Sequence, residues 1–410
     1  MSTRTYKIHR QFGWISSGRV LAAVIQAVTL VMLIRSVDPA TFGIVSAALG
    51  AIVVAQTGFD LGIPALAARE RAVNPNARVI GASLRLNTIT SLILLLVLTC
   101  LALALGTILP VFYTLAPLAL SAAAERVADA RLAIAIADGD AHLNTSVLVG
   151  RRALALSMLL GALYATQMDP VFAFSLAMAI SALGSMILAI FSTRGRIREH
   201  SQVRVRTLLR AANPYWINSL ATQLRNLDTV IAAWLAGAVQ GGYYGAAARL
   251  STPLRIPATS LGAALLPAAA RVKARSEWKP LLRVVAIALV ASTVAYGVLI
   301  PLCPYFIPIL LGADYMEAVP VVQVVLAGLP FAAAVSMLAA LLQGMGRKKT
   351  VAVSAVGSTL VCLCLVVAGS LAGLATFAAL GLAVSFVVQA LVLSVALAHC
   401  YQIFNSEAAN

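Results

Sequence analysis

Long apolar stretches recur along this sequence from one end to the other. Each is about as long as the ~20 residues that an α-helix needs to cross the hydrocarbon core of a bilayer. Of the 410 residues, 61% are hydrophobic and only 11% are charged, whereas ordinary soluble domains are about one quarter charged. The pattern predicts an all-α, polytopic membrane protein.

We expect about twelve transmembrane helices in two bundles of six. The expected spans are 14–35, 43–67, 80–109, 115–137, 147–166, 171–192, 213–236, 243–270, 284–311, 318–344, 350–370 and 374–398. The longest and most charged connection, 193–210, separates the halves. We therefore predict an N-terminal six-helix lobe at 1–200 and a C-terminal six-helix lobe at 201–410.

Basic residues predict how the chain is oriented in the membrane. The net charge is +16, and 23 of the 30 Lys and Arg residues lie in or beside alternate short connections. These basic segments are 4–10, 69–85, 151–152, 194–210, 271–283 and 347–349. Because such residues stay on the cytoplasmic side, both termini are expected there. The same placement explains the charge without a nucleic-acid partner.

The two halves show weak self-similarity at an offset of 202 residues. Trp14 aligns with Trp216, Phe42-Gly43 with Tyr244-Gly245, and Arg69 with Arg271. Two halves with an even number of spans each would be parallel repeats about an axis along the membrane normal. Repeats of this kind can rock around a central cavity, which is the geometry of alternating access.

Basic residues inside the predicted membrane region are all arginine. They are Arg19, Arg35, Arg126, Arg131, Arg225, Arg249 and Arg255. With Arg35 assigned to the interface, six arginines face only four interior carboxylates, Asp60, Glu125, Asp129 and Asp228. Charges inside a membrane are costly and mark functional sites, and arginine grips phosphate through two parallel hydrogen bonds. The balance favours an anionic substrate.

The stretch 213–257 combines most of these charges. We expect two apolar helices joined by a turn at 237–242, with Arg225 and Asp228 in the first helix and Arg249 in the second. Arg255 lies between Pro253 and Pro257, which should break the second helix. An alternative is that Arg225 and Asp228 form a structural ion pair at i,i+3.

Two further groups of charges lie in the first half. Glu125 and Asp129 share a face of the span 115–137, and Arg126 lies at i,i+3 from Asp129. They form either part of a cavity or a self-neutralising cluster that packs the span against its neighbours.

Asp60 lies between Gly58 and Gly62, and Pro64 follows. This segment predicts either a discontinuous helix that exposes backbone to an ion or proton path, or a close packing contact made by the two glycines. Arg19 and Gln26, seven residues apart, share one helical face.

No signature of a soluble enzyme or a metal site is present. The sequence lacks a Walker-A loop, His-Glu-x-x-His and Gly-x-Ser-x-Gly. Its five cysteines and four histidines are scattered without zinc-ligand spacing. We expect neither enzymatic activity nor a cofactor.

Several short motifs resemble a known family. They are Phe-Gly-Trp at 12–14, Asp-Pro-Ala-Thr-Phe-Gly at 38–43, Leu-Asp at 227–228, Gly-Gly-Tyr-Tyr-Gly-Ala-Ala-Ala-Arg-Leu at 241–250 and Leu-Gly-Ala-Asp-Tyr-Met-Glu-Ala at 311–318. With twelve spans, the chain resembles the Wzx-type oligosaccharide flippases of the multidrug/oligosaccharidyl-lipid/polysaccharide (MOP) exporter superfamily. The resemblance covers nearly the whole chain.

This resemblance implies a function. Such flippases move undecaprenyl-pyrophosphate-linked oligosaccharide repeat units from the cytoplasmic to the periplasmic leaflet of the bacterial inner membrane, for O-antigen or exopolysaccharide synthesis. Their cationic central cavity would correspond here to Arg19, Arg126, Arg225, Arg249 and Arg255. Candidates for ion or proton coupling are Asp60, Glu125, Asp129 and Asp228. The expected partners are the lipid-linked glycan, membrane lipids and, as candidates, a polysaccharide polymerase or copolymerase; we expect a monomer.

Three other functions are alternatives. A multidrug or small-molecule exporter of the same fold is the main alternative, although its cavity should be richer in carboxylates and aromatic residues. A lipid II flippase typically has two more spans. A glycan polymerase or ligase needs a sizeable outer loop, whereas the outer loops here are only a few residues long.

Overall fold

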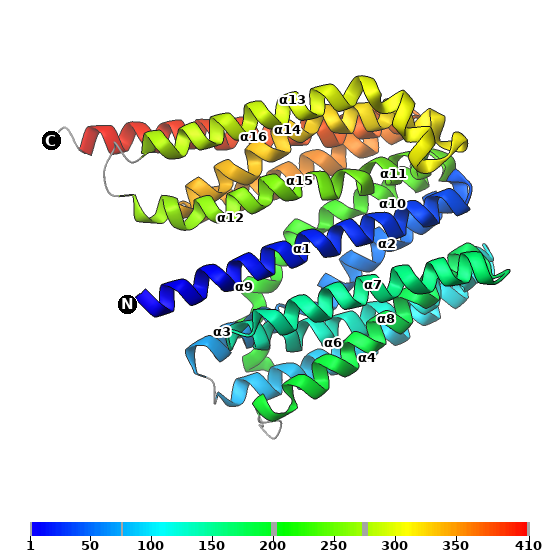
Figure 1. Cartoon of the computed structure of the whole chain (residues 1–410), viewed down its shortest axis with the longest axis horizontal. Helices are drawn as coiled ribbons and strands as arrows, with labels where there is room; N and C mark the ends of the chain where they lie inside the picture. Colours follow the sequence, from blue (N-terminus) through cyan, green and yellow to red (C-terminus); the bar gives the residue numbers. More distant parts are fainter. Residues whose placement is uncertain (1, 75–76, 198–202, 273–277, 408–410) are drawn as a thin grey trace. The chain divides into compact units, whose positions relative to one another are not determined.

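The computed structural model describes residues 2–74, 77–197, 203–272 and 278–407. Over these residues the chain is a succession of helices without strands (Figure 1). The first elements are α1 (Ser2–Ser36), α2 (Pro39–Asp60), α3 (Ile63–Val73), α4 (Arg78–Gly106), α5 (Val111–Leu115), α6 (Pro117–Ala137), α7 (Ala141–Ala165), α8 (Pro170–Thr193), the 3-10 turn η1 (Arg194–Arg196) and α9 (Val205–Gln223). The later elements are η2 (Leu224–Asn226), α10 (Leu227–Leu235), α11 (Ala238–Leu254), α12 (Ile256–Arg271), α13 (Trp278–Leu311), η4 (Ala313–Ala318), α14 (Val319–Gly344), α15 (Lys348–Leu371) and α16 (Ala375–Glu407).

The chain folds into two compact units. The first comprises Met1–Val37 and Ala48–Gln223, and the second comprises Asp38–Ala47 and Leu224–Asn410. The start of α2 therefore belongs with the second unit. The boundary predicted between residues 200 and 201 falls outside the described residues.

Nine helices in the described part of the chain are long and apolar enough to cross a membrane. They correspond to nine of the twelve expected spans, and they confirm the polytopic α-helical fold. The other three expected spans differ for physical reasons. Helix α6 carries four charged residues in its middle, and the regions 213–236 and 243–270 are each broken into shorter helices. The count of twelve stays a prediction.

The first interruption separates α2 from α3 at Leu61 and Gly62. Both residues have positive φ, 52° for Leu61 and 70° for Gly62, a conformation that glycine adopts without strain. A Cβ at Gly62 would lie 2.4 Å from the carbonyl oxygen of Ala212, so α9 also requires glycine here. The Trp216 indole donates to the carbonyls of Thr57 and Gly58, both at 3.1 Å. The predicted discontinuous helix is therefore present, whereas Gly58 has no close packing neighbour.

The second interruption replaces the continuous helix expected over 213–236. Helix α9 ends at Gln223, one 3-10 turn containing Arg225 follows, and α10 starts at Leu227. No proline or glycine marks this position in the sequence. The prediction of one helix was wrong here.

The third interruption lies at Arg255, where the flanking prolines predicted it. Helix α11 ends at Leu254, and Pro257 occupies the first turn of α12. The connection before α11 is shorter than the expected 237–242, because only Gly237 (φ 91°) leaves the helical region and α11 begins at Ala238.

Close backbone contact explains why glycine is required where α2 and α11 cross. The start of α2 crosses α11 within the second unit, and a Cβ at Gly43 would lie 1.9 Å from the carbonyl oxygen of Ala238. A Cβ at Gly242 would lie 1.9 Å from that of Pro39. Small residues let helix backbones approach closely in membrane proteins. Both Phe42 and Tyr244, which the internal repeat aligns, are fully buried.

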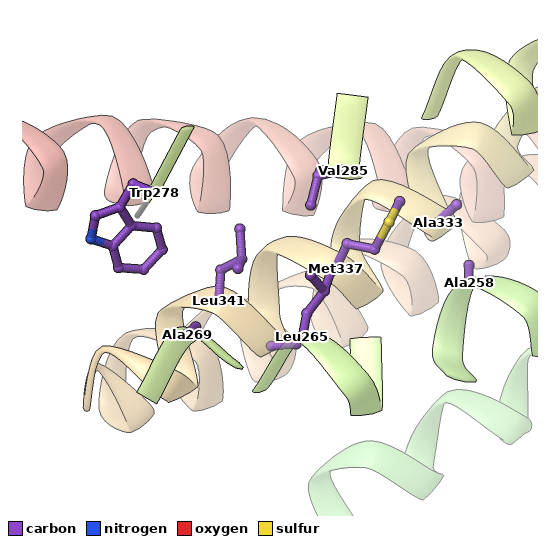
Figure 2. Packing of buried hydrophobic residues seen from close by; sticks show 9 residues of the cluster. Ala258, Leu265, Ala269, Trp278, Val285, Ala333, Met337 and Leu341 are labelled. Carbon is purple, nitrogen blue, oxygen red and sulfur yellow. The ribbon is translucent and has the colours of Figure 1, made fainter. Parts of the chain in front are cut away.

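An apolar cluster forms the core of the second unit on one side. Figure 2 shows Leu265 of α12, Val285 of α13 and Met337 of α14 among the packed side chains of this cluster. Leu341, one turn after Met337, extends the same contact, and Trp278 adds its indole ring. Met337 and Leu341 are fully buried, so α14 is the central helix of this cluster.

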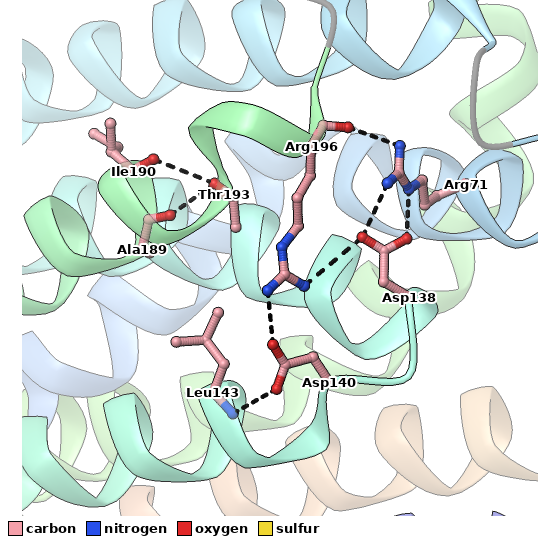
Figure 3. A network of polar contacts seen from close by, with 8 residues as sticks. All are labelled: Arg71, Asp138, Asp140, Leu143, Ala189, Ile190, Thr193 and Arg196. Carbon is pink, nitrogen blue, oxygen red and sulfur yellow. Dashed lines mark hydrogen bonds and ion pairs between the residues drawn. The ribbon is translucent and has the colours of Figure 1, made fainter.

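A polar network holds one end of the first unit (Figure 3). Arg71 of α3 binds Asp138 through two parallel hydrogen bonds of 2.6 and 3.0 Å, and it donates to the carbonyl of Arg196 at 2.8 Å. Arg196 binds Asp140 at 2.7 Å, and Asp140 caps α7 by accepting from the Leu143 N–H at 3.2 Å. Two arginines that the sequence assigned to topology therefore also connect α3, η1 and the α6–α7 corner.

Candidate functional site

Arg225 lies in the 3-10 turn η2 that interrupts the helix between α9 and α10. Its guanidinium carbon lies 4.2 Å from the centroid of the Phe386 ring. The same group donates a hydrogen bond to the hydroxyl of Ser385, which in turn donates to the carbonyl of Leu382 at 2.7 Å. Arg225 is thus positioned by α16, because Ser385 and Phe386 are consecutive residues of that helix.

Arg255 reaches the same aromatic ring from a different element. Its guanidinium carbon lies 5.0 Å from the Phe386 centroid. The break between α11 and α12 places this residue outside the regular helices, next to Leu254, whose carbonyl accepts a hydrogen bond of 2.8 Å from the Tyr296 hydroxyl. Two guanidinium groups and one ring form the basic cluster of the second unit. Cations are attracted to the face of an aromatic ring, which offsets part of their mutual repulsion.

Arg249 is a third cation of the second unit. It donates to the carbonyl of Ser46 in α2, at 3.4 Å. In Arg225, Arg249 and Arg255 alike, the Nε atom is buried and has no hydrogen-bond partner among the described residues. Buried donors without partners are costly, and an anion with several oxygens would supply the missing acceptors.

The expected alternative, a direct Arg225–Asp228 ion pair, is wrong. Asp228 is 7% exposed and instead accepts from the Tyr244 hydroxyl at 2.9 Å and from the Thr229 N–H at 2.6 Å. The i,i+3 geometry assumed one continuous α-helix. Arg225 lies in a 3-10 turn, and its guanidinium group is turned toward α16.

Arg126 forms a separate polar site in the first unit. It is 7% exposed, and its Nη2 donates to the carbonyl of Phe59 at 2.8 Å, to Asn87 at 3.2 Å and to Thr90 at 3.1 Å. Phe59 precedes the α2–α3 interruption, so Arg126 binds a carbonyl beside the break. Asp60 makes no hydrogen bond or ion pair with any residue that the structure describes, and the charges that act on it are Arg126 and Asp129.

Glu125 and Asp129 pair with a different helix from the one expected. Arg151 of α7 lies 3.6 Å from Glu125 and 3.2 Å from Asp129, and Arg152 lies 3.3 Å from Glu125. The sequence interpretation placed these two arginines beside a loop and paired Asp129 with Arg126. Helix α7 starts earlier, at Ala141, so that both arginines lie well inside it. Two carboxylates and two arginines balance, which supports a self-neutralising cluster between α6 and α7.

The remaining predicted cation, Arg19, lies on an exposed position of α1 in the first unit and makes no hydrogen bond or ion pair with the residues described. Within the described ranges, no group of three His, Cys, Asp or Glu side chains could hold a metal ion, and the five cysteines are free.

Sequence reasoning missed the groups that position the charges. These are Phe386, Ser385, Tyr244, Asn87, Thr90, Arg151 and Arg152. A phenylalanine or serine inside an apolar span carries no local signal of a functional contact. The two arginines could have been found by extending the helix back to its Asp140 cap.

Comparison with solved structures identifies the class of fold. An inward-facing multidrug resistance MATE family transporter of the MOP superfamily matches with a TM-score of 0.75 and 14% identity, over 94% of this chain and 96% of that one. Lipid II flippase MurJ in an inward closed conformation matches with 0.72 and 13%, over 93% and 87%. A MOP superfamily transporter from Pyrococcus furiosus matches with 0.62 and 14%, over 96% of both chains. This chain is an integral membrane protein with the fold of MOP-superfamily transporters.

The sequence then identifies the family. A family model described as polysaccharide biosynthesis protein matches residues 8–128 and 141–273, which is more than half of the chain. The chain belongs to the polysaccharide biosynthesis protein family. A search of curated protein sequences found no match.

Proposed function

We propose that this protein is a flippase for undecaprenyl-pyrophosphate-linked oligosaccharide repeat units, moving them from the cytoplasmic to the periplasmic leaflet of a bacterial inner membrane. The observation that carries the proposal is the pair of guanidinium groups, Arg225 and Arg255, on the single ring of Phe386. The family and the fold support the same reading.

A pyrophosphate linker is suited to this pair. It carries two adjacent phosphates, and each can accept charge-assisted hydrogen bonds from one planar guanidinium group. Neither arginine forms an ion pair with a carboxylate among the described side chains, and each keeps a buried Nε donor without a partner. The anion would therefore supply the hydrogen bonds that these arginines lack, and it would not have to displace a carboxylate.

The other predicted residues take distinct parts in the proposal. Arg249 would be a third substrate-binding cation of the second unit. Arg19 and Arg126 are the candidate substrate-binding residues of the first unit. For ion or proton coupling, Asp60 and Asp228 are the stronger candidates, because Glu125 and Asp129 already pair with arginines. Transport would follow the alternating access expected of two six-helix halves, with both termini cytoplasmic.

This activity breaks no covalent bond, so it requires no enzyme chemistry and no cofactor. The partners would be the lipid-linked glycan, the surrounding lipids and, in the cell, a polysaccharide polymerase or copolymerase that uses the flipped repeat unit for O-antigen or exopolysaccharide. The protein would act as a monomer.

The test is the sidedness of lipid-linked glycan in a strain that lacks the gene, read with a membrane-impermeant glycan probe. The proposal expects repeat units trapped on the inner leaflet. The wild-type gene and the Arg194→Ala control, an exposed arginine of η1, should release them, whereas an Arg225→Ala/Arg255→Ala double variant should not. Normal outer-leaflet glycan in the deletion strain, with no second flippase, would favour export of drugs or other small molecules instead.

A further inference from the structure

A groove runs between α15 and α16 in the second unit, and Phe386 is not among its lining residues. It encloses about 600 Å³, and its lining includes Lys349, Ser354, Gly357, Val361, Gln389 and Val392. Most of the lining is apolar, and the neighbouring Val353 and Leu360 of α15 are 71% and 59% exposed. In a membrane protein such a face lies against lipid, so the groove is open to acyl chains.

The length of the groove matches one leaflet. Along α15 it extends from Lys349 to Val361, which at 1.5 Å per residue is roughly 18 Å. Half of the hydrocarbon core of a bilayer is about 15 Å thick. A phospholipid acyl chain has this reach, whereas a polyprenyl chain is several times longer.

One end of the groove is strongly basic. Arg347, Lys348 and Lys349 are consecutive and exposed, and Lys349 lines the groove itself. Helix α15 begins at Lys348, and no side chain caps its N-terminus. The free N–H groups of a helix N-terminus and neighbouring lysines together attract a phosphate.

A buried polar group lies deeper in the groove. Gln389 is 7% exposed and has no hydrogen-bond partner in the described part of the chain, although a buried amide normally has one. The hydroxyls of Ser354 and Ser358 are already used, donating to the carbonyls of Val351 and Ser385. The amide of Gln389 is therefore a polar group of the groove that makes no hydrogen bond with the described residues.

The pairing of the two helices gives the depth of this amide. Ser358 binds the carbonyl of Ser385, so in these antiparallel helices Gln389, one turn after Ser385, lies near the level of Ser354. Ser354 is five residues from Lys349, or about 7 Å along the helix. The ester carbonyls of a glycerophospholipid lie at a similar short distance below its phosphate.

We propose that this groove binds one anionic phospholipid. Its phosphate lies at Lys349 and the N-terminus of α15, one ester carbonyl accepts a hydrogen bond from the Gln389 amide, and an acyl chain runs past Gly357 to Val361. The inference rests on membrane insertion and is independent of the transported substrate.

The test is native mass spectrometry of the purified full-length protein titrated with dioleoylphosphatidylglycerol or dioleoylphosphatidylcholine. The wild type should retain one phosphatidylglycerol in preference to phosphatidylcholine. Lys349→Gln should weaken retention by about fivefold, the effect of one lysine near a charged headgroup. Gln389→Leu should weaken it as well, through the lost hydrogen bond.

A matched pair of glycine variants tests the acyl-chain path. A Cβ at either Gly357 or Gly161 meets no atom within 4 Å, and both glycines are exposed on helices. Gly357→Leu should fill the groove and abolish the retained lipid, while Gly161→Leu on α7 should not. Equal retention of both lipids by the wild type would overturn the proposal. Unchanged retention in Lys349→Gln, whose side chain is exposed and whose fold is not at risk, would also overturn it.

Discussion

The guanidinium groups of Arg225 and Arg255 lie over one aromatic ring, at 4.2 and 5.0 Å from the centroid of Phe386. The two arginines come from different interruptions of the helical structure, a 3-10 turn and a proline-flanked junction. Helix breaks are tolerated inside membrane proteins where the freed groups meet other protein groups or line a cavity. The ring therefore holds two cations near one another, and neither forms an ion pair with a carboxylate of the described residues.

Replacing the ring should weaken transport while leaving both charges in place. Phe386→Leu removes two cation–π contacts, and a loss of about 0.5 kcal/mol or more for each corresponds to roughly a fivefold lower rate at limiting substrate. The measurement is flipping of lipid-linked glycan in proteoliposomes. Phe377→Leu is the control, since Phe377 lies on the same helix with its side chain 45% exposed. Equal flipping rates for Phe386→Leu and Phe377→Leu would show that the Phe386 ring is not part of the substrate site.

The Asp228–Tyr244 hydrogen bond should stabilise the second unit. Tyr244 is fully buried, and Tyr244→Phe would leave the buried Asp228 without its side-chain donor. We expect the free energy of unfolding to fall by about 1–3 kcal/mol. Unfolding in detergent should show non-additive effects of Tyr244→Phe and Asp228→Asn, because the residues are in contact. Tyr164→Phe, at a side chain 83% exposed, should be neutral, and additive losses would argue against the contact.

Close backbone contact at the crossing of α2 and α11 should make two glycines intolerant of a methyl group. Gly43→Ala and Gly242→Ala would each place a Cβ 1.9 Å from a carbonyl oxygen, and overpacking of this kind costs about 1–3 kcal/mol. Gly184→Ala in α8 is the matched control, because its Cβ would meet no atom within 4 Å. Thermal unfolding of the three variants checks this, with only the control expected at or above the wild-type midpoint. A similar thermal unfolding midpoint for all three variants would contradict the close contact between α2 and α11.

Acid should weaken the α6–α7 corner through Asp140. The hydrogen bond from Arg196, together with the Leu143 N–H, holds the pKa of Asp140 below its ordinary value. A lowered folded-state pKa means that the stabilisation is present above about pH 4, the unfolded value, and is lost as pH falls through the folded value. The pair is about one third exposed, so its contribution is about 0.2–1 kcal/mol.

The matching variant is Asp140→Asn, which keeps a good helix N-cap and removes the charge. At neutral pH it should unfold at a lower temperature than the wild type, and the difference should shrink on acidification below about pH 4. A constant difference across this range would show that the charge of Asp140 plays no part.

Local sequence signals predicted some of this arrangement. Prolines 253 and 257 marked the break at Arg255, and the glycines around Asp60 marked the end of α2. No comparable signal precedes Arg225, where Leu224 and Asn226 are compatible with a helix, so its 3-10 turn depends on tertiary contacts with α16. Phe386 contacts both arginines because of how α16 packs in the fold. The residues next to Phe386 in the sequence carry no local signal of this packing.

We propose that Arg225 and Arg255 bind the pyrophosphate of a lipid-linked glycan during its translocation. The most direct measurement reconstitutes the purified protein in liposomes with a fluorescent polyprenyl-pyrophosphate-linked glycan and follows access of an impermeant probe. We expect flipping by the wild type and by Arg194→Ala. The Arg225→Ala/Arg255→Ala variant should flip about tenfold more slowly or worse, given about 1.5–3 kcal/mol for a hydrogen bond to a charged group. Flipping by the folded double variant at the wild-type rate, or no flipping by the wild type above protein-free liposomes, would contradict it.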